Sequence, residues 1–179
     1  MKRIVFIYGL IATTVFVVTQ FGSMPFWKNG TLTFENGELV GYTSMVVALS
    51  MVFFGVKSYR DNHLDGSITF GKAFQVGLLI STVAAVGYAT SWEFYFNIFA
   101  PDFLDEYAAF AINKAKSKGA AEAELNALIS QMDQAKEMYK NPFLRFGMTL
   151  MEVFPVGILI SLISAALLRK KNFLASQPA

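Results

Sequence analysis

Long apolar stretches separated by polar segments define the organisation of this chain. Four of these stretches reach the ~17–25 residues that an α-helix needs to cross ~30 Å of hydrocarbon. Polar residues such as Gln20 and Gln75 interrupt them, but each stretch has Lys or Arg at one flank. The pattern therefore predicts four membrane-spanning helices at residues 4–21, 39–56, 73–96 and 146–168.

Composition supports this class of protein. Of the 179 residues, 54% are hydrophobic and 16% are charged, against ~25% charged residues in an ordinary soluble domain. The net charge of +2 comes without a basic stripe with interleaved aromatics outside the predicted spans, so nucleic acid is not an expected partner. The absence of cysteine excludes disulfides, thiol catalysis and cysteine-ligated metals.

The amino terminus has features of both a signal peptide and a first span. Met1-Lys2-Arg3 is a basic segment before an apolar run, as in a signal peptide. However, the run continues through Phe21, longer than the usual ~7–15 residues, and no small-x-small cleavage site follows. We expect an uncleaved first span.

The distribution of cations predicts the orientation. Lys and Arg flank the amino terminus, the 57–72 loop and the end of the fourth span, whereas the first loop carries only Lys28. The positive-inside rule then places both termini in the cytoplasm. The 57–72 loop is either a plain turn, in which Ser67 or Thr69 caps the third span, or a basic-aromatic patch for anionic lipid formed by Tyr59, Arg60 and Lys72.

The segment between the third and fourth spans is predicted to fold as a helical hairpin over residues 101–141. Asp102 is a candidate N-cap, and Gly119 is a natural terminator between the two helices. Each helix carries one apolar stripe, at Phe103, Tyr107 and Phe110 and at Leu125, Leu128, Met132, Ala135 and Tyr139. The stripes could pack on each other, bind another protein or lie on the lipid interface.

Small residues on each span predict how the helices pack, because close approach drives association in lipid. They are Gly9, Ala12 and Thr13; Gly41, Ser44, Ala48 and Gly55; Gly77, Ser81, Ala84 and Ala85; and Gly157, Ser161, Ser164 and Ala165. These faces predict an intramolecular bundle, with a homo-oligomer as the alternative. The expected fold is an all-α integral membrane protein with four transmembrane helices and an extracytoplasmic helical hairpin.

Two carboxylates form the only candidate ion site. Glu93 and Glu152 are predicted to lie at nearly the same depth of the third and fourth spans, and Pro155 follows Glu152 and frees the carbonyl of Met151. The pair could share a proton, hold a cation or contact a partner. Alternatively, both carboxylates reach interfacial water, Lys140 or Arg145. The 61–72 segment fails as a calcium loop because His63 and Lys72 occupy ligand positions.

Several segments together resemble a family of small bacterial inner-membrane proteins known only as a domain of unknown function. They are Gly41-Tyr42-Thr43-Ser44-Met45, Phe54-Gly55-Val56-Lys57-Ser58-Tyr59-Arg60-Asp61, Gly66-Ser67-Ile68-Thr69-Phe70-Gly71-Lys72-Ala73-Phe74, Lys140-Asn141-Pro142-Phe143 and Glu152-Val153-Phe154-Pro155-Val156-Gly157. The resemblance implies four spans, a long helical outer loop and a place in the bacterial inner membrane. It implies no activity, so no catalytic residues carry over.

The function predicted from these observations is that of a non-enzymatic accessory component of the cell envelope, without metal or cofactor. Its partners are the lipid bilayer and an envelope protein bound through the hairpin. The alternative is a small permease or channel subunit that uses Glu93 and Glu152. The positions inward of these carboxylates are mostly apolar, which favours the first class.

Overall fold

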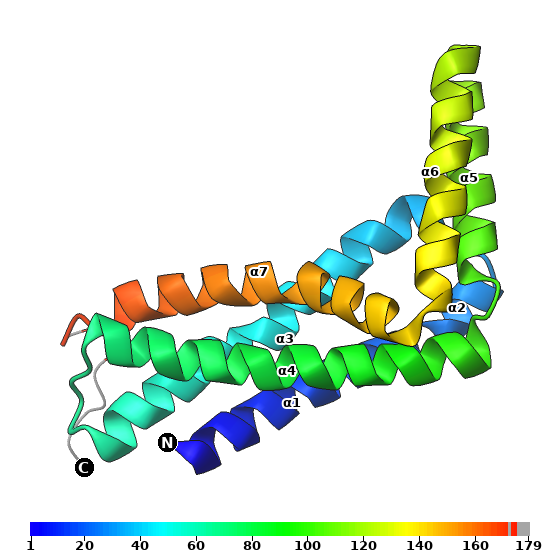
Figure 1. The fold of residues 1–179 in the computed structure, drawn as a ribbon. Helices are drawn as coiled ribbons and strands as arrows, with labels where there is room; N and C mark the ends of the chain where they lie inside the picture. Colours follow the sequence, from blue (N-terminus) through cyan, green and yellow to red (C-terminus); the bar gives the residue numbers. More distant parts are fainter. Residues whose placement is uncertain (172, 175–179) are drawn as a thin grey trace. The chain divides into compact units, whose positions relative to one another are not determined.

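The computed structural model describes residues 1–171, 173 and 174, and every regular element in this part of the chain is a helix. The elements follow one another along the chain as shown in Figure 1. They are α1 (Lys2–Gly22), α2 (Met24–Lys28), α3 (Phe34–His63), α4 (Phe70–Phe99), α5 (Phe103–Ser117), α6 (Glu122–Lys140) and α7 (Pro142–Leu168). In the described residues, four helical segments are long and apolar enough to cross a membrane, which confirms the predicted all-α fold with four spans.

The chain divides into two compact units. The first, which we call the bundle unit, comprises Met1–Ala89 and the chain from Leu150 onward. The second, the helix-pair unit, comprises Thr90–Thr149. Helices α4 and α7 each begin in one unit and end in the other.

Small residues bring the helices of the bundle unit into close contact. A Cβ at Gly9 of α1 would lie 2.6 Å from the Cβ of Val83 in α4, and one at Gly157 of α7 would lie 2.8 Å from the Cβ of Ser81. The Ser81 hydroxyl also donates to the Gly157 carbonyl at 3.2 Å. These contacts confirm the predicted small-residue packing for α1, α4 and α7.

Helix α3 confirms the packing prediction in only one of its halves. Ala48 is fully buried, and a Cβ at Gly55 would lie 3.0 Å from the Cβ of Tyr8. A Cβ at Gly41 would have no neighbour within 4 Å, and all six residues from Glu38 to Thr43 are exposed. The prediction that Gly41 packs against another helix is therefore wrong within this chain, because no described side chain comes close enough to meet a Cβ at that position.

Local side-chain bonds define where two of the spans begin. The first turn of α3 has a capping box in which the backbone N–H of Thr33 donates to the Asn36 side chain at 2.7 Å. At the start of α4, the Thr69 hydroxyl accepts from the backbone N–H of Lys72 at 3.3 Å, as predicted for a cap of the third span. The short helix α2 was not predicted; the Trp27 ring at its end lies against Gly37.

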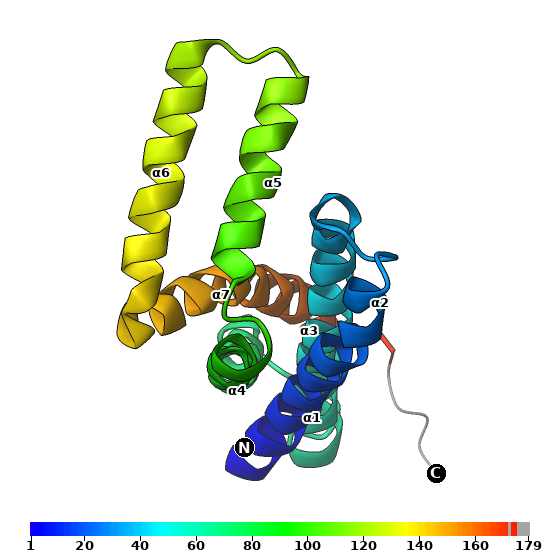
Figure 2. The same ribbon diagram turned by 90° about the vertical axis from the view of Figure 1, so that its right-hand side faces the viewer.

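In the helix-pair unit, α5 and α6 lie side by side and run in opposite directions (Figure 2). Gly119 between them has a φ of +76°, which favours glycine. Asp102 is the N-cap of α5 but makes no side-chain capping bond. The predicted stripe on α6 is turned inward: Tyr139 is buried and its other four residues are half-buried. The extracytoplasmic location of α5 and α6 stays a prediction.

Candidate functional site

The most heavily connected ionic group of the helix-pair unit is the ion pair between Glu93 and Arg145. Nε of Arg145 donates to Oε1 of Glu93 at 2.9 Å, and Nη2 donates to Oε2 at 2.5 Å. Arg145 near the start of α7 is only 4% exposed. This bidentate geometry engages both oxygens of the carboxylate, which makes it one of the strongest side-chain pairings in proteins.

Aromatic rings enclose this ion pair. The guanidinium carbon of Arg145 lies 4.3 Å from the ring centroid of Phe96, and Nη1 donates to the backbone carbonyl of Tyr139 at 3.0 Å. The Tyr139 hydroxyl accepts from the indole N–H of Trp92 at 2.9 Å. The cluster therefore ties the end of α4 to the end of α6 and the start of α7. Its groups are matched to one another, which is typical of a structural site.

Glu152, the other predicted site residue, has a different environment. Its side chain is exposed on α7, and it makes no ion pair or hydrogen bond with any residue that the structure describes. Pro155 is also exposed and lies within the continuous helix α7. For Glu93 the structure shows the predicted alternative, a pairing with Arg145. A joint ion or partner site of Glu93, Glu152 and Pro155 stays a prediction.

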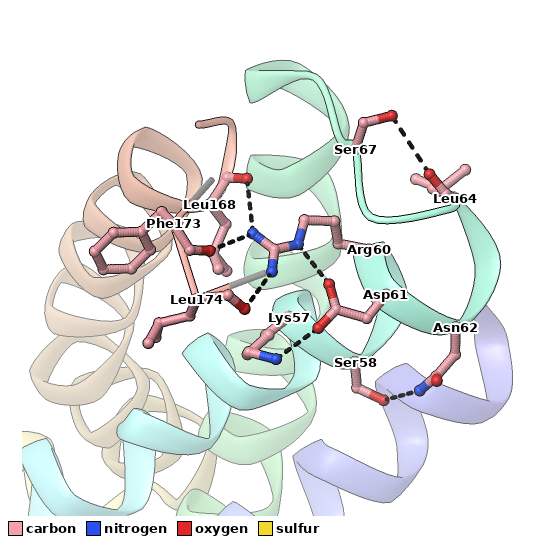
Figure 3. Close-up of polar contacts among 10 residues, drawn as sticks. All are labelled: Lys57, Ser58, Arg60, Asp61, Asn62, Leu64, Ser67, Leu168, Phe173 and Leu174. Atoms are coloured by element: carbon pink, nitrogen blue, oxygen red, sulfur yellow. Dashed lines mark hydrogen bonds and ion pairs between the residues drawn. The ribbon is translucent and has the colours of Figure 1, made fainter. Parts of the chain in front are cut away.

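A second buried arginine lies in the bundle unit, as shown in Figure 3. Arg60 near the end of α3 is fully buried, and its Nη1 donates to the carbonyls of Leu168 at 3.4 Å and Phe173 at 2.8 Å. Its Nη2 donates to the carbonyl of Leu174 at 3.0 Å. The cation thus satisfies carbonyls at the carboxyl end of α7, where the helix dipole also favours positive charge.

Asp61 completes the Arg60 cluster. Its carboxylate accepts from Nε of Arg60 at 2.6 Å and from Nζ of Lys57 at 2.6 Å. Because Arg60 is buried and bonded to Asp61 and to three carbonyls, the predicted basic-aromatic patch is wrong for this residue. The ring of His63 stacks on Tyr59 with the centroids 5.4 Å apart. Among the described residues, no group of three or more His, Cys, Asp or Glu is placed to hold a metal ion.

Sequence reasoning identified part of one of these two clusters and left a usable signal in the other. The i,i+4 spacing of Lys57 and Asp61 is a signal for their ion pair, and Arg145 was one of the predicted alternative partners of Glu93. The bonds from Arg60 to backbone carbonyls were missed. No side-chain pattern could reveal them, since every residue carries a carbonyl.

A groove runs along the helix-pair unit. Its volume is about 1060 Å³, and residues from the end of α4, from α5 and from α6 line it. Its apolar part includes Leu104, Ile129 and Met138; Ile129 is 38% exposed and Met138 is 45% exposed. Charged residues also line the groove, namely Asp105, Asp133, Lys136, Glu137 and Lys140.

The charges of this groove are largely paired within the chain. Asp105 pairs with Lys136 at 2.6 Å, and Glu137 pairs with Lys140 at 2.6 Å. Asp133 is the third carboxylate, which leaves one negative charge in excess. The hydrogen bond to Asp105 raises the pKa of Lys136, and its attraction to Asp105 and Asp133 adds to the effect.

The fold and these sites define the class of the protein. Four helical segments of sufficient length and apolar character make it a multi-pass membrane protein. Residues 7–170 match the family model described as a protein of unknown function, DUF4199, and the chain therefore belongs to that family. This match confirms the resemblance noted in the sequence. Comparisons with curated proteins and with solved structures gave no match.

Proposed function

We propose that this protein is a non-enzymatic accessory component of the bacterial inner membrane that binds another envelope protein through its helix-pair unit. The observation that carries the proposal is the groove of about 1060 Å³ along α5 and α6. In this proposal both termini are cytoplasmic, and the groove faces the extracytoplasmic side. The cation distribution of the sequence supports that orientation.

The chemistry of the groove fits a helical segment with one apolar face and a basic residue. Exposed Ile129 and Met138 provide apolar area, and such side chains commonly bind the apolar face of an amphipathic helix. The one negative charge that the groove carries in excess favours a basic residue on the partner. A partner surface at this place would also cover the exposed side chains of Ile129 and Met138.

The ion pairs support an accessory function better than a transport function. Both oxygens of Glu93 are engaged by Arg145, and Arg60 is fully engaged with carbonyls and Asp61. A permease that uses Glu93 would have to break a buried bidentate pair in each cycle, which is costly. The absence of cysteine and the single histidine restrict the chemistry available to an enzyme.

Three successive residues of α6 provide a sharp test. Ile129 lines the groove, Leu128 is half-buried and belongs to the predicted apolar stripe of α6, and Ala127 is exposed and outside the groove. The tagged full-length protein is purified from membranes in mild detergent, and co-purifying proteins are quantified by mass spectrometry. We expect Ile129→Asp to abolish a partner that Ala127→Asp retains.

Leu128→Asp is the folding control. An aspartate in the seam between α5 and α6 should unfold the helix pair and expose it to protease, with the four spans still inserted. If Ile129→Asp co-purifies with the same partners as the wild type, the proposed function is contradicted. If Leu128→Asp is as resistant to protease as the wild type, the apolar stripes of α5 and α6 do not pack on each other at Leu128.

A further inference from the structure

The exposed face of α7 carries an ionisable group among apolar side chains. Glu152 is exposed together with Met151, Pro155, Leu159 and Ile163. Met151 is 74% exposed and Leu159 is 56% exposed, so this surface of the span faces away from the bundle. In a membrane protein such a face contacts lipid or another helix.

The depth of Glu152 makes lipid a poor neighbour. At ~1.5 Å per residue, it lies ~25 Å along α7 from Arg169, which is within the ~30 Å of the hydrocarbon core. An ionised carboxylate is unfavourable there, and such residues usually have a protein partner or a functional role. The described residues of this chain provide no donor to Glu152.

Pro155 adds a second acceptor at the same place. Because proline has no N–H, the carbonyl of Met151 loses the donor that would normally bond to it from residue 155. This carbonyl lies in the same turn of α7 as Glu152. The exposed face therefore combines a carboxylate with a backbone carbonyl that lacks its helical donor.

Two acceptors without donors are complementary to a cation that carries several N–H groups. A second copy of this chain is a poor source, since its predicted spans 4–21, 39–56, 73–96 and 146–168 contain no Lys or Arg. Arg60 and Arg145, nearer the helix ends, are already bonded within the chain. We propose that the face of α7 around Glu152 and Pro155 binds a transmembrane helix of another protein, with a Lys or Arg of that helix bonded to Glu152. This inference rests on the proposed accessory function and adds a contact within the membrane.

The test uses a designed probe in place of the natural partner. The full-length protein is reconstituted in phosphatidylcholine vesicles with a polyleucine transmembrane peptide that carries one Arg at the depth of Glu152. A peptide with Leu at that position is the reference. Binding is measured by energy transfer between labels on the protein and the peptide. We expect the wild type to prefer the Arg peptide by about three- to twentyfold, the range of interhelical hydrogen bonds in membranes.

Glu152→Gln should remove most of this preference, because the amide carries no charge. Glu38→Gln is the matched control: it removes an exposed carboxylate near the start of α3 and should keep the full preference. Pro155→Ala restores a donor for the Met151 carbonyl and should lower the preference partially. Each variant is compared with the wild type by melting temperature in detergent, so that a folding defect is recognised.

Equal binding of both peptides to the wild type would overturn the inference, as would an unchanged preference in Glu152→Gln. If Glu152→Gln fails to fold, Pro155→Ala decides, and a full preference in that variant also overturns the inference. If one of these results is obtained while Ile129→Asp still loses a partner that Ala127→Asp retains, the inference fails but the proposed function is unaffected. The opposite result is a wild type that still prefers the Arg peptide while Ile129→Asp retains all the partners of the wild type. It would contradict the proposed function but not the inference about α7.

Discussion

The two units of this protein each bury an arginine, and the two arginines find different partners. In the helix-pair unit, Arg145 is 4% exposed and bonds both oxygens of Glu93 on α4. In the bundle unit, Arg60 is fully buried and donates to three backbone carbonyls beyond or at the end of α7 as well as to Asp61. Arg145 thus joins two side chains, whereas Arg60 stabilises the carboxyl end of helix α7.

This difference determines how each unit responds to loss of its cation. Removal of Arg145 leaves the Glu93 carboxylate without its cation beside the half-buried Phe96 and the buried Tyr139, and an unpaired charge in such a place is unfavourable. Removal of Arg60 leaves neutral carbonyls and Asp61, which still has Lys57 at 2.6 Å. Neutral acceptors near a helix end cost less, because water can reach some of them. We therefore expect the helix-pair unit to be the more sensitive one.

Arg145→Ala should have the largest effect. We expect a loss of about 3–5 kcal/mol in the stability of the helix-pair unit, the range for breaking a buried ion pair on one side. The measurement is chemical denaturation in detergent followed by Trp92 fluorescence, with limited proteolysis of residues 103–140. Arg145→Lys keeps the charge but not the bidentate geometry and should recover only part of the loss. An unaffected Arg145→Ala would show that the pair contributes nothing.

Arg60→Ala should have a smaller effect, confined to the end of α7. The loss of charge-assisted bonds to the carbonyls predicts about 1.5–3 kcal/mol. Hydrogen exchange should accelerate at the amides around Leu168, and the melting temperature should fall. Arg169→Ala is the control, because Arg169 is exposed at the same helix end. Equal exchange in both variants would contradict the role of Arg60.

Close packing gives a third test, on the bundle unit alone. Gly9→Ala places a Cβ 2.6 Å from the Cβ of Val83, so one of the helices must shift. Overpacking of this kind costs about 1–3 kcal/mol. Gly41→Ala meets nothing within 4 Å and should be neutral or slightly stabilising, since Ala forms helices better than Gly. Melting in detergent compares them. A similar loss for both would mean that Gly41 has a close neighbour after all.

Periodicity and composition were enough to predict the spans, because a membrane imposes a length and an apolar character on each helix. The small-residue faces at Gly9, Gly77 and Gly157 were equally predictable, since close approach needs small side chains. Gly41 shows the limit of this reasoning. A Cβ at Gly41 would meet nothing within 4 Å, and sequence alone does not say which small residues of a helix have a close neighbour.

The candidate sites were less predictable for a physical reason. Glu93 and Glu152 have the same chemistry and a similar predicted depth, yet one is bonded by Arg145 and the other by no described residue. The distinction depends on which face of each helix is turned inward, and a one-residue change in helix phase moves a side chain by ~100°. Ala108 illustrates the same point: it is only 4% exposed in α5 but was absent from the predicted stripe of larger residues.

Loss of the ion pair between Asp105 and Lys136 should have the smallest effect on stability. An exposed ion pair contributes much less than the largely buried pair of Arg145 and Glu93. The atoms of the Asp105–Lys136 pair are 2.6 Å apart, but the side chain of Asp105 is 69% exposed, so solvent screens the attraction. The hydrogen bond to Asp105 raises the pKa of Lys136 above its ordinary value, with attraction to Asp105 and Asp133 in support. The contribution to stability is therefore fully present below the ordinary pKa of ~10.4 and is lost as the pH rises through the raised pKa.

Asp105→Asn should lower the pKa of Lys136 toward that ordinary value and leave the melting temperature at neutral pH almost unchanged. The measurement is an NMR titration of the Lys136 side chain in the full-length protein. Glu124→Gln removes a carboxylate of α6 that lies about three turns from Lys136, and it should not change the pKa of Lys136. A pKa of Lys136 that is the same in Asp105→Asn and wild type would show that the contact is not maintained in solution. A large drop in melting temperature would instead place Asp105 with Arg145 among the groups that hold the helix-pair unit together.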